Sequence, residues 1–109
     1  RLAGEMVSRG DIWLVLPEAG SATAEPQPCV VLSPPEIHDH LAVVTVAPVT
    51  SGGTPAAYRI PIKLNNQDGR IRLEQLRTVE KRALTRQVGS VEGKTLAAML
   101  AILREMFAE

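Results

Sequence analysis

Two neighbouring residues with hydroxyl groups, Thr50 and Ser51, follow a long apolar segment and precede two glycines. The segment Leu41–Gly53 reads L-A-V-V-T-V-A-P-V-T-S-G-G, and its content of Val and Thr favours a central β-strand over a helix. Pro48 is expected to end the hydrogen-bonded ladder, and the glycines supply turn conformations that β-branched residues avoid. Both hydroxyls are therefore predicted on a loop supported by a sheet, where they can contact a substrate. An ordinary hairpin turn has the same residue pattern.

A second group that could do chemistry is the segment His38-Asp39-His40. The imidazole pKa lies close to neutrality in the absence of perturbation, which suits proton transfer. Two histidines without a third ligand are weak support for a metal site, so a surface or structural role is favoured for both. Cys29 is the only cysteine, which excludes an internal disulfide and a cysteine-cluster metal site, and its apolar neighbours predict a buried thiol.

The length of 109 residues suits one domain with a single core, which we place at residues 6–109. We interpret Arg1–Glu5 as a cloning remnant or a disordered start. The apolar share of 45% and the charged share of 22% are typical of a soluble globular protein. No apolar run approaches the roughly 18 residues that cross a bilayer, and the first residues lack the order of a signal peptide. We therefore expect a cytoplasmic protein without a membrane segment.

The formal net charge is zero, but the charges are unevenly distributed. No Lys or Arg occurs between Asp11 and Tyr58, whereas nine occur between Arg59 and Lys94. One surface could therefore attract a polyanion or an acidic protein segment. A solvated surface with many ion pairs is an equally good interpretation.

Strands and a terminal helix must position these side chains. Six strands are expected, at residues 12–16, 29–33, 41–46, 58–64, 71–75 and 86–91, with a long loop at 17–28 and a short helical turn within 77–84. Ser90 is expected to cap a C-terminal helix with one apolar stripe, formed by Leu96, Met99, Leu100, Leu103 and Phe107. The fold class is therefore mainly β with a C-terminal α-helix. We expect an SH3-like barrel with one opening covered by the helix, and a coiled sandwich is the second choice.

Five motifs, in order along the chain, resemble the MazF/PemK family of toxins. They are Arg9-Gly10-Asp11-Ile12-Trp13, Gly20-Ser21, Pro28-Cys29-Val30-Val31-Leu32-Ser33, Ala47-Pro48-Val49-Thr50-Ser51 and Glu74-Gln75-Leu76-Arg77-Thr78-Val79. The resemblance runs from about Met6 to the C-terminus. It implies a CcdB/PemK-like SH3 barrel, a homodimer, and a type II toxin–antitoxin endoribonuclease (mRNA interferase) that cleaves single-stranded RNA at a short sequence. It also implies a cognate antitoxin whose acidic, largely disordered tail lies across the RNA groove, and DNA binding through the antitoxin complex.

The resemblance implies a reaction without a metal ion or a cofactor. A base removes the proton of a ribose 2′-hydroxyl, the oxygen attacks the adjacent phosphorus, and an acid protonates the departing 5′-oxygen. In relatives, a threonine that matches Thr50 and an arginine directly before a proline carry this chemistry. This chain has Gln27 at the arginine position, before Pro28. Because a neutral amide cannot neutralise the phosphorane, and loss of such a group typically costs on the order of 10²–10⁴ in rate, we expect weak or absent ribonuclease activity.

Five further residues are implied to contact RNA. Ser21, Ser51 and Gln75 match positions along the RNA groove of relatives, and Arg77 and Lys81 are expected to contact backbone phosphates. Without the resemblance, Ser21 would be a turn residue, Ser51 a loop cap and Gln75 an exposed strand residue. Arg77 and Lys81 could equally pair with Glu74 and Glu80. Aromatic residues make up only 3% of the chain, so recognition is expected to use polar edges and shape instead of a stacking platform.

A binding module is the alternative to an enzyme. A CcdB-like toxin that binds an antitoxin or a topoisomerase without cutting RNA would have the same barrel. A barrel that serves only for dimerisation is the third interpretation. Cyclic-phosphate ends produced from a mixed single-stranded RNA would favour the enzyme, and antitoxin binding without cleavage would favour the module.

Overall fold

The computed structural model of the chain describes residues 7–17, 25–34, 41–51 and 58–108. Within these residues there are seven strands, two short 3₁₀ helices and one α-helix. The strands are β1 (Asp11–Val15), β2 (Gln27–Val31), β3 (Val43–Thr50), β4 (Arg59–Leu64), β5 (Gln67–Arg72), β6 (Arg77–Glu80) and β7 (Leu84–Ser90). The helical segments are η1 (Leu73–Gln75), η2 (Lys81–Ala83) and α2 (Gly93–Met106).

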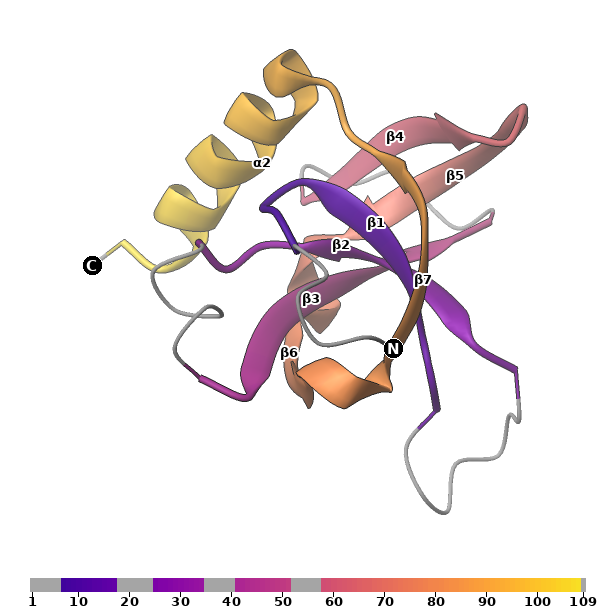
Figure 1. Cartoon of the computed structure of the whole chain (residues 1–109). Helices are drawn as coiled ribbons and strands as arrows, with labels where there is room; N and C mark the ends of the chain where they lie inside the picture. Colours follow the sequence, from indigo (N-terminus) through magenta and orange to yellow (C-terminus); the bar gives the residue numbers. More distant parts are fainter. Residues whose placement is uncertain (1–6, 18–24, 35–40, 52–57, 109) are drawn as a thin grey trace.

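The strands form one antiparallel sheet in the order β4-β5-β3-β2-β1-β7, and β6 also pairs with β3. Figure 1 shows that the sheet is strongly bent, with α2 at the upper left and the β4–β5 hairpin at the upper right. The expected class, mainly β with a C-terminal helix, is confirmed. In the part of the chain that the structure describes, no helix is long and apolar enough to cross a membrane.

The buried residues form two clusters, and β3 contributes to both because its successive side chains point to opposite faces of the sheet. Val46 belongs to the cluster that contains Trp13 and Cys29. Val49 belongs to the cluster that contains Met99 of α2. The helix therefore covers one face of β3, and the other face is available to position polar residues at the end of the strand.

The apolar stripe of α2 faces the core, but the helix starts later than expected. Met99 is fully buried and the three leucines of the stripe are half-buried, whereas Phe107 follows the last turn and is 70% exposed. The prediction that Ser90 caps this helix is wrong. Ser90 ends β7 opposite Asp11, and Glu92 is the N-cap residue without a side-chain cap hydrogen bond. Because Ser90 belongs to the β1–β7 ladder, it lies too far from the first helical turn to cap it.

β3 continues through Pro48 to Thr50, so the prediction that Pro48 ends the ladder is wrong. The Leu32 N–H donates to Thr45 O at 2.8 Å, so the odd-numbered residues of β3 direct their backbone groups toward β2. Pro48 therefore faces the other edge, where β3 changes partner from β6 to β5 between residues 46 and 49. Its missing N–H falls in this interval, so no ladder hydrogen bond is lost.

The turn between β4 and β5 consists of Asn65 and Asn66, whose φ angles are 52° and 66°. A two-residue type I′ hairpin requires positive φ at both positions, and asparagine tolerates this conformation better than most residues. β5 therefore begins at Gln67, and residues 73–75 form η1 instead of the end of the strand expected at 71–75.

Two further boundaries differ from the expectations. Residues 77–80 form β6, which pairs with Val43–Val46 of β3, so only part of the expected helical turn within 77–84 is helical, at η2. β2 begins at Gln27, two residues earlier than expected, and Gln27 pairs with Val15 of β1. Gln27 therefore lies on the sheet itself and not in the preceding loop.

Candidate active site

Thr50 and Arg72 form the polar contact on which the candidate site is built. Each is the last residue of its strand, β3 or β5, and each is half-buried. The Arg72 Nε donates a hydrogen bond to the Thr50 Oγ1. Thr50 pairs directly with Arg70, and Arg72 lies two residues further along β5, on the same face and diagonal to Thr50. A guanidinium and a hydroxyl thus lie side by side at the end of β3.

The alternation of β4 and β5 fixes which face carries the arginines. Ile60 of β4 pairs with Ile71 of β5, and both pack in the cluster that α2 covers. The residues next to them along the strand must face the other way, so Arg70 and Arg72 share the face of Thr50. Burial of the two isoleucines therefore positions the two arginines.

Gly69 allows β5 to approach the end of β3 closely. A Cβ at this position would lie 3.1 Å from Val49 Cγ1 and 3.3 Å from the Thr50 carbonyl oxygen. Both distances are shorter than ordinary van der Waals contacts, so a side chain here would press the two strands apart. The short distance between the strands keeps the arginine within hydrogen-bond reach of Thr50.

Arg59 of β4 lies directly opposite Arg72, and two like charges at opposed positions repel each other. Glu74 of η1 compensates one of them. Its Oε2 accepts a hydrogen bond from Arg59 Nε at 3.1 Å and lies 3.0 Å from Arg59 Nη2, with the two side chains 19% and 25% exposed. Among the described residues, the Arg72 guanidinium has only the neutral Thr50 hydroxyl as a hydrogen-bond partner. Its positive charge is therefore available to an anion.

Gln27 starts β2 and is half-buried. β2 and β3 pair through Cys29 and Pro48, and the same register continued by two residues brings Gln27 opposite Thr50. The Gln27 carbonyl oxygen accepts a contact from the Cys29 Sγ at 3.6 Å. Gln27, Thr50 and Arg72 are thus on one face, with β3 between the other two strands.

Cys29 and Arg77 extend this face toward the core. The Cys29 side chain is fully buried, and burial raises the pKa of its thiol to about 11 against the opposing effect of the Arg77 charge and hydrogen bond. The thiol is therefore neutral near pH 7 and is not a nucleophile. Arg77, half-buried on β6, pairs with Val46 and so lies on the same face of β3 as Thr50.

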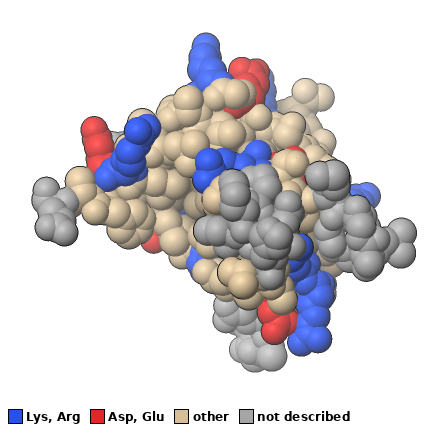
Figure 2. Space-filling view, turned by 60° about the vertical axis from the view of Figure 1, so that its left-hand side comes forward, with Lys and Arg blue, Asp and Glu red and all other residues tan. Residues whose placement is uncertain are grey.

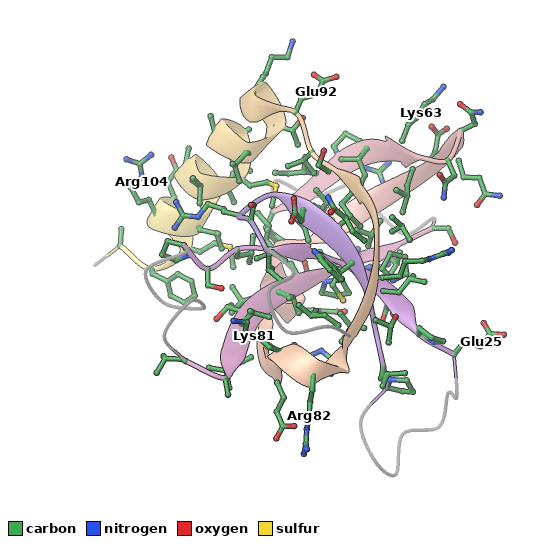
Figure 3. All side chains as sticks on the ribbon, in the orientation of Figure 1. Glu25, Lys63, Lys81, Arg82, Glu92 and Arg104 are labelled. Carbon is green, nitrogen blue, oxygen red and sulfur yellow. The ribbon has the colours of Figure 1, made fainter. Side chains whose placement is uncertain are left out.

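The other predicted RNA contacts are spread over the molecule. Ser51 follows Thr50 directly and is exposed, and Gln75 is exposed in η1, three residues after Arg72. Lys81 lies at the other end of β3, where its N–H donates to Ala42 O at 2.8 Å, roughly 25 Å of strand away from Thr50. Figure 3 shows Lys81 beside Arg82 at the lower end of the molecule, away from the β4–β5 hairpin.

Some predicted residues cannot be placed. Ser21, His38 and His40 lie outside the described residues. Among the residues that are described, no three His, Cys, Asp or Glu side chains lie close enough together to hold a metal ion.

The Lys and Arg residues do not form one continuous patch on the face drawn in Figure 2, where the described basic side chains lie in separate places and several have an acidic neighbour. Two of the described basic residues form ion pairs, Arg59 with Glu74 and Arg82 with Glu80. The uneven distribution of charge along the sequence is therefore partly compensated in space. On the face that carries Thr50, Arg72 contacts the Thr50 hydroxyl and has no ion pair with a described carboxylate.

Sequence reasoning did not single out Arg72. The residue appears there only as one of the nine bases between Arg59 and Lys94. The signal that could have found it is the alternation Arg70-Ile71-Arg72 after the Asn65-Asn66 turn. It predicts a strand with both arginines on one face, and the strand that follows the turn pairs with the end of the threonine strand.

Solved structures of toxins share this fold. The Mycobacterium tuberculosis toxin MazF-mt6 superposes with a TM-score of 0.75 at 22% sequence identity, covering 89% of this chain and 95% of that chain. A MazE–MazF structure from Deinococcus radiodurans gives a TM-score of 0.79 at 17% identity, with 95% and 97% covered. A mycobacterial endoribonuclease solved in complex with its cognate antitoxin gives 0.77 at 17% identity, with 92% and 93% covered. These similarities confirm the expected barrel fold.

No curated protein matches the chain in sequence. A family model matches residues 8–107, which is nearly the whole chain. The match includes the end of β3 with Thr50, the hairpin with Arg72 and the terminal helix. The chain therefore belongs to the family of PemK-like, MazF-like toxins of type II toxin–antitoxin systems.

Proposed function

We propose that this protein is an endoribonuclease toxin that cleaves single-stranded RNA at a short sequence by attack of a ribose 2′-hydroxyl on the adjacent phosphorus. The observation that carries the proposal is the contact between the Thr50 hydroxyl and the Arg72 guanidinium, on the face of β3 that also holds Gln27. The products are a 2′,3′-cyclic phosphate and a 5′-hydroxyl. The 2′-O–P bond forms as the P–O5′ bond breaks, and the proton lost by the 2′-oxygen is balanced by the proton gained by the 5′-oxygen.

Thr50 is suited to contact the scissile phosphate. Its oxygen accepts a hydrogen bond from Arg72, so its own proton is free to point at a phosphoryl oxygen. A charged donor on the hydroxyl oxygen polarises the O–H bond, which makes the hydroxyl a stronger donor. Donors aimed at the phosphorane supply a large share of the rate in such reactions.

Gln27 alone argues for reduced activity. It can donate a hydrogen bond from its amide but carries no charge to balance the phosphorane. The reduction of the cleavage rate expected from a neutral residue at this position, on the order of 10²–10⁴-fold, applies only when no other cation reaches the phosphate. Arg72 lies on the same face and contacts Thr50 directly, so the size of the deficit depends on Arg72.

The RNA path in this proposal follows the end of β3. Ser51 directly follows Thr50 and Gln75 comes three residues after Arg72, both are exposed, and Arg77 lies on the same face of β3 as Thr50. Backbone phosphates next to the scissile one would contact Arg77. Lys81 would meet only phosphates several nucleotides away, because it lies at the far end of β3.

We further propose a cognate antitoxin and a homodimer as the partners. The support is the family and the solved structures of related fold, two of which are complexes of a toxin with its antitoxin. An acidic tail of the antitoxin would compete with RNA for the charge of Arg72, and binding of the antitoxin would therefore block cleavage.

The test is incubation of the purified protein with a mixed pool of single-stranded RNA in the presence of EDTA. We expect cleavage at a defined short sequence, with cyclic-phosphate and 5′-hydroxyl ends read by their resistance or sensitivity to end-specific enzymes. Thr50→Val is the negative control, since it removes the hydroxyl with little change of shape. Binding of an antitoxin without any cleavage, by the wild type and by Gln27→Arg alike, would instead support the CcdB-like binding module.

A further inference from the structure

We propose that Arg72 of β5 supplies the positive charge at the scissile phosphate that the residue at position 27 lacks in this chain. The inference rests on the proposed ribonuclease function and deepens it by naming the cation of the reaction. It assigns the charge to a different strand from the one that carries Gln27, and Thr50 lies on β3 between them.

The geometry of the guanidinium supports this role. Arg72 uses its Nε to hold the Thr50 hydroxyl, which leaves the two terminal nitrogens without a hydrogen bond to any described residue. A guanidinium presents its donors in a planar fork that matches two oxygens of a phosphate. One side chain can therefore orient Thr50 through Nε and hold the phosphoryl oxygens through its terminal nitrogens.

The charges around Arg72 also favour it over the other arginines on this face. Arg59, directly opposite, is compensated by Glu74 at 3.0 Å. The Arg77 guanidinium contacts the buried Cys29 thiol, and its charge partly offsets the rise that burial causes in the pKa of that thiol. Arg70 is paired with Thr50 in the ladder, but the side chain that donates to the hydroxyl is that of Arg72.

Partial burial increases the effect of this charge. The side chains of Thr50 and Arg72 are half-buried, and Gly69 keeps the two strands close. Electrostatic interactions are stronger and less screened by salt at such a position than on an exposed surface. A cation held here in advance of the reaction stabilises developing negative charge without reorganisation.

The experiment compares four proteins: the wild type, Arg72→Gln, Gln27→Arg and the double variant. Single-turnover cleavage of one RNA oligonucleotide gives the rate constant of the chemical step, and titration of its 2′-deoxy analogue gives the affinity. We expect Arg72→Gln to lower the rate constant by about 10²–10³-fold while affinity changes by less than about 10-fold. We expect the double variant to have a rate constant at least about 10-fold higher than that of Arg72→Gln alone. In the wild-type background, Gln27→Arg is expected to change the rate constant little.

Lys63→Gln is the matched control. Lys63 lies on the same hairpin and on the same face as Arg72, near the turn, so the substitution removes one charge from this face away from Thr50. We expect its rate constant to stay within about twofold of the wild type. Thermal unfolding of all variants separates a loss of chemistry from a loss of fold.

The outcomes separate this inference from the proposed function. If the wild type cleaves RNA and Arg72→Gln cleaves equally fast, Arg72 does not supply the charge and the proposed function stands. If the wild type is inactive and Gln27→Arg is active, the fold is that of a nuclease but Arg72 does not replace the missing arginine. If neither the wild type nor Gln27→Arg cleaves RNA, the proposed function is wrong, and the role assigned to Arg72 is wrong as well.

Discussion

Glu74 of η1 and Arg59 of β4 form a partly buried ion pair, and this pair determines that, of the two opposed arginines Arg59 and Arg72, it is Arg72 that is left uncompensated. Arg59 and Arg72 occupy directly opposed positions on β4 and β5. Because the carboxylate binds Arg59, the opposed charge of Arg72 remains available to Thr50 and to an anion. A residue outside both strands thus sets the electrostatics at the end of β3.

Glu74→Gln should therefore strengthen RNA binding at low salt. The substitution keeps the size of the side chain but leaves Arg59 uncompensated on the face of Thr50, so one more phosphate can be neutralised. For single-stranded RNA, the slope of log affinity against log salt should steepen by about 0.7 per added contact. Fluorescence anisotropy with a 2′-deoxy oligonucleotide at several salt concentrations measures it. Glu80→Gln, which releases the exposed Arg82 instead, is the control, and an unchanged slope in Glu74→Gln contradicts the prediction.

Thr50→Val should lower the rate constant of cleavage by about 10²-fold, because it removes a donor aimed at the phosphorane and the acceptor that orients Arg72. The fold should be retained, since valine is close in shape and Thr50 is only half-buried. Single-turnover kinetics and a thermal melt measure the two effects. Thr45→Val makes the same change earlier on β3, where the hydroxyl lies 3.4 Å from that of Thr78. Equal rates for both variants would show that the Thr50 hydroxyl is not needed.

The class of fold could be predicted from residue pattern because both core faces are encoded locally. The alternating apolar residues of the strands and the helical spacing around Met99 each identify a buried face. The strand boundaries were harder to predict. The Asn65-Asn66 turn decides where β5 begins, and the change of partner strand at Pro48 decides that β3 continues, so both depend on the pairing of segments that are distant in sequence.

The candidate site was predictable only in part, for the same reason. Thr50 could be found because a hydroxyl after an apolar strand is a local pattern. The alternation around Arg72 predicts a strand with both arginines on one face, but not the contact of Arg72 with Thr50, because that contact spans 22 residues and depends on the register of β5 against β3. Removing a residue from the β4–β5 turn would shift β5 by one residue against β4, and such a shift turns every side chain of a strand to its other face.

Asn66→Gly tests the turn that sets the register of β5 against β4. Asn66 has a φ of 66°, a conformation that glycine adopts at no steric cost, and Asn-Gly is the preferred type I′ pair. We expect the free energy of unfolding to rise by up to about 1 kcal/mol, whereas Asn66→Ala should lower it by about 1 kcal/mol. Chemical denaturation of the three proteins measures both. A drop in stability for glycine would show that the asparagine side chain, and not the backbone conformation, maintains the turn.

The buried Cys29 thiol should make the protein less stable at alkaline pH. The native thiol has a pKa of about 11, above the ordinary value of 9.0, because burial disfavours the thiolate more than the Arg77 charge favours it. The unfolded thiol ionises first, so this contribution to stability is complete below pH 9.0 and is lost as the pH rises toward about 11. The loss at pH 11 should be about 2–3 kcal/mol. Denaturant unfolding between pH 8 and pH 11 measures it, and Cys29→Ala should remove this part of the pH dependence. If both proteins lose stability in parallel, other groups are responsible and the native thiol ionises as readily as the unfolded one.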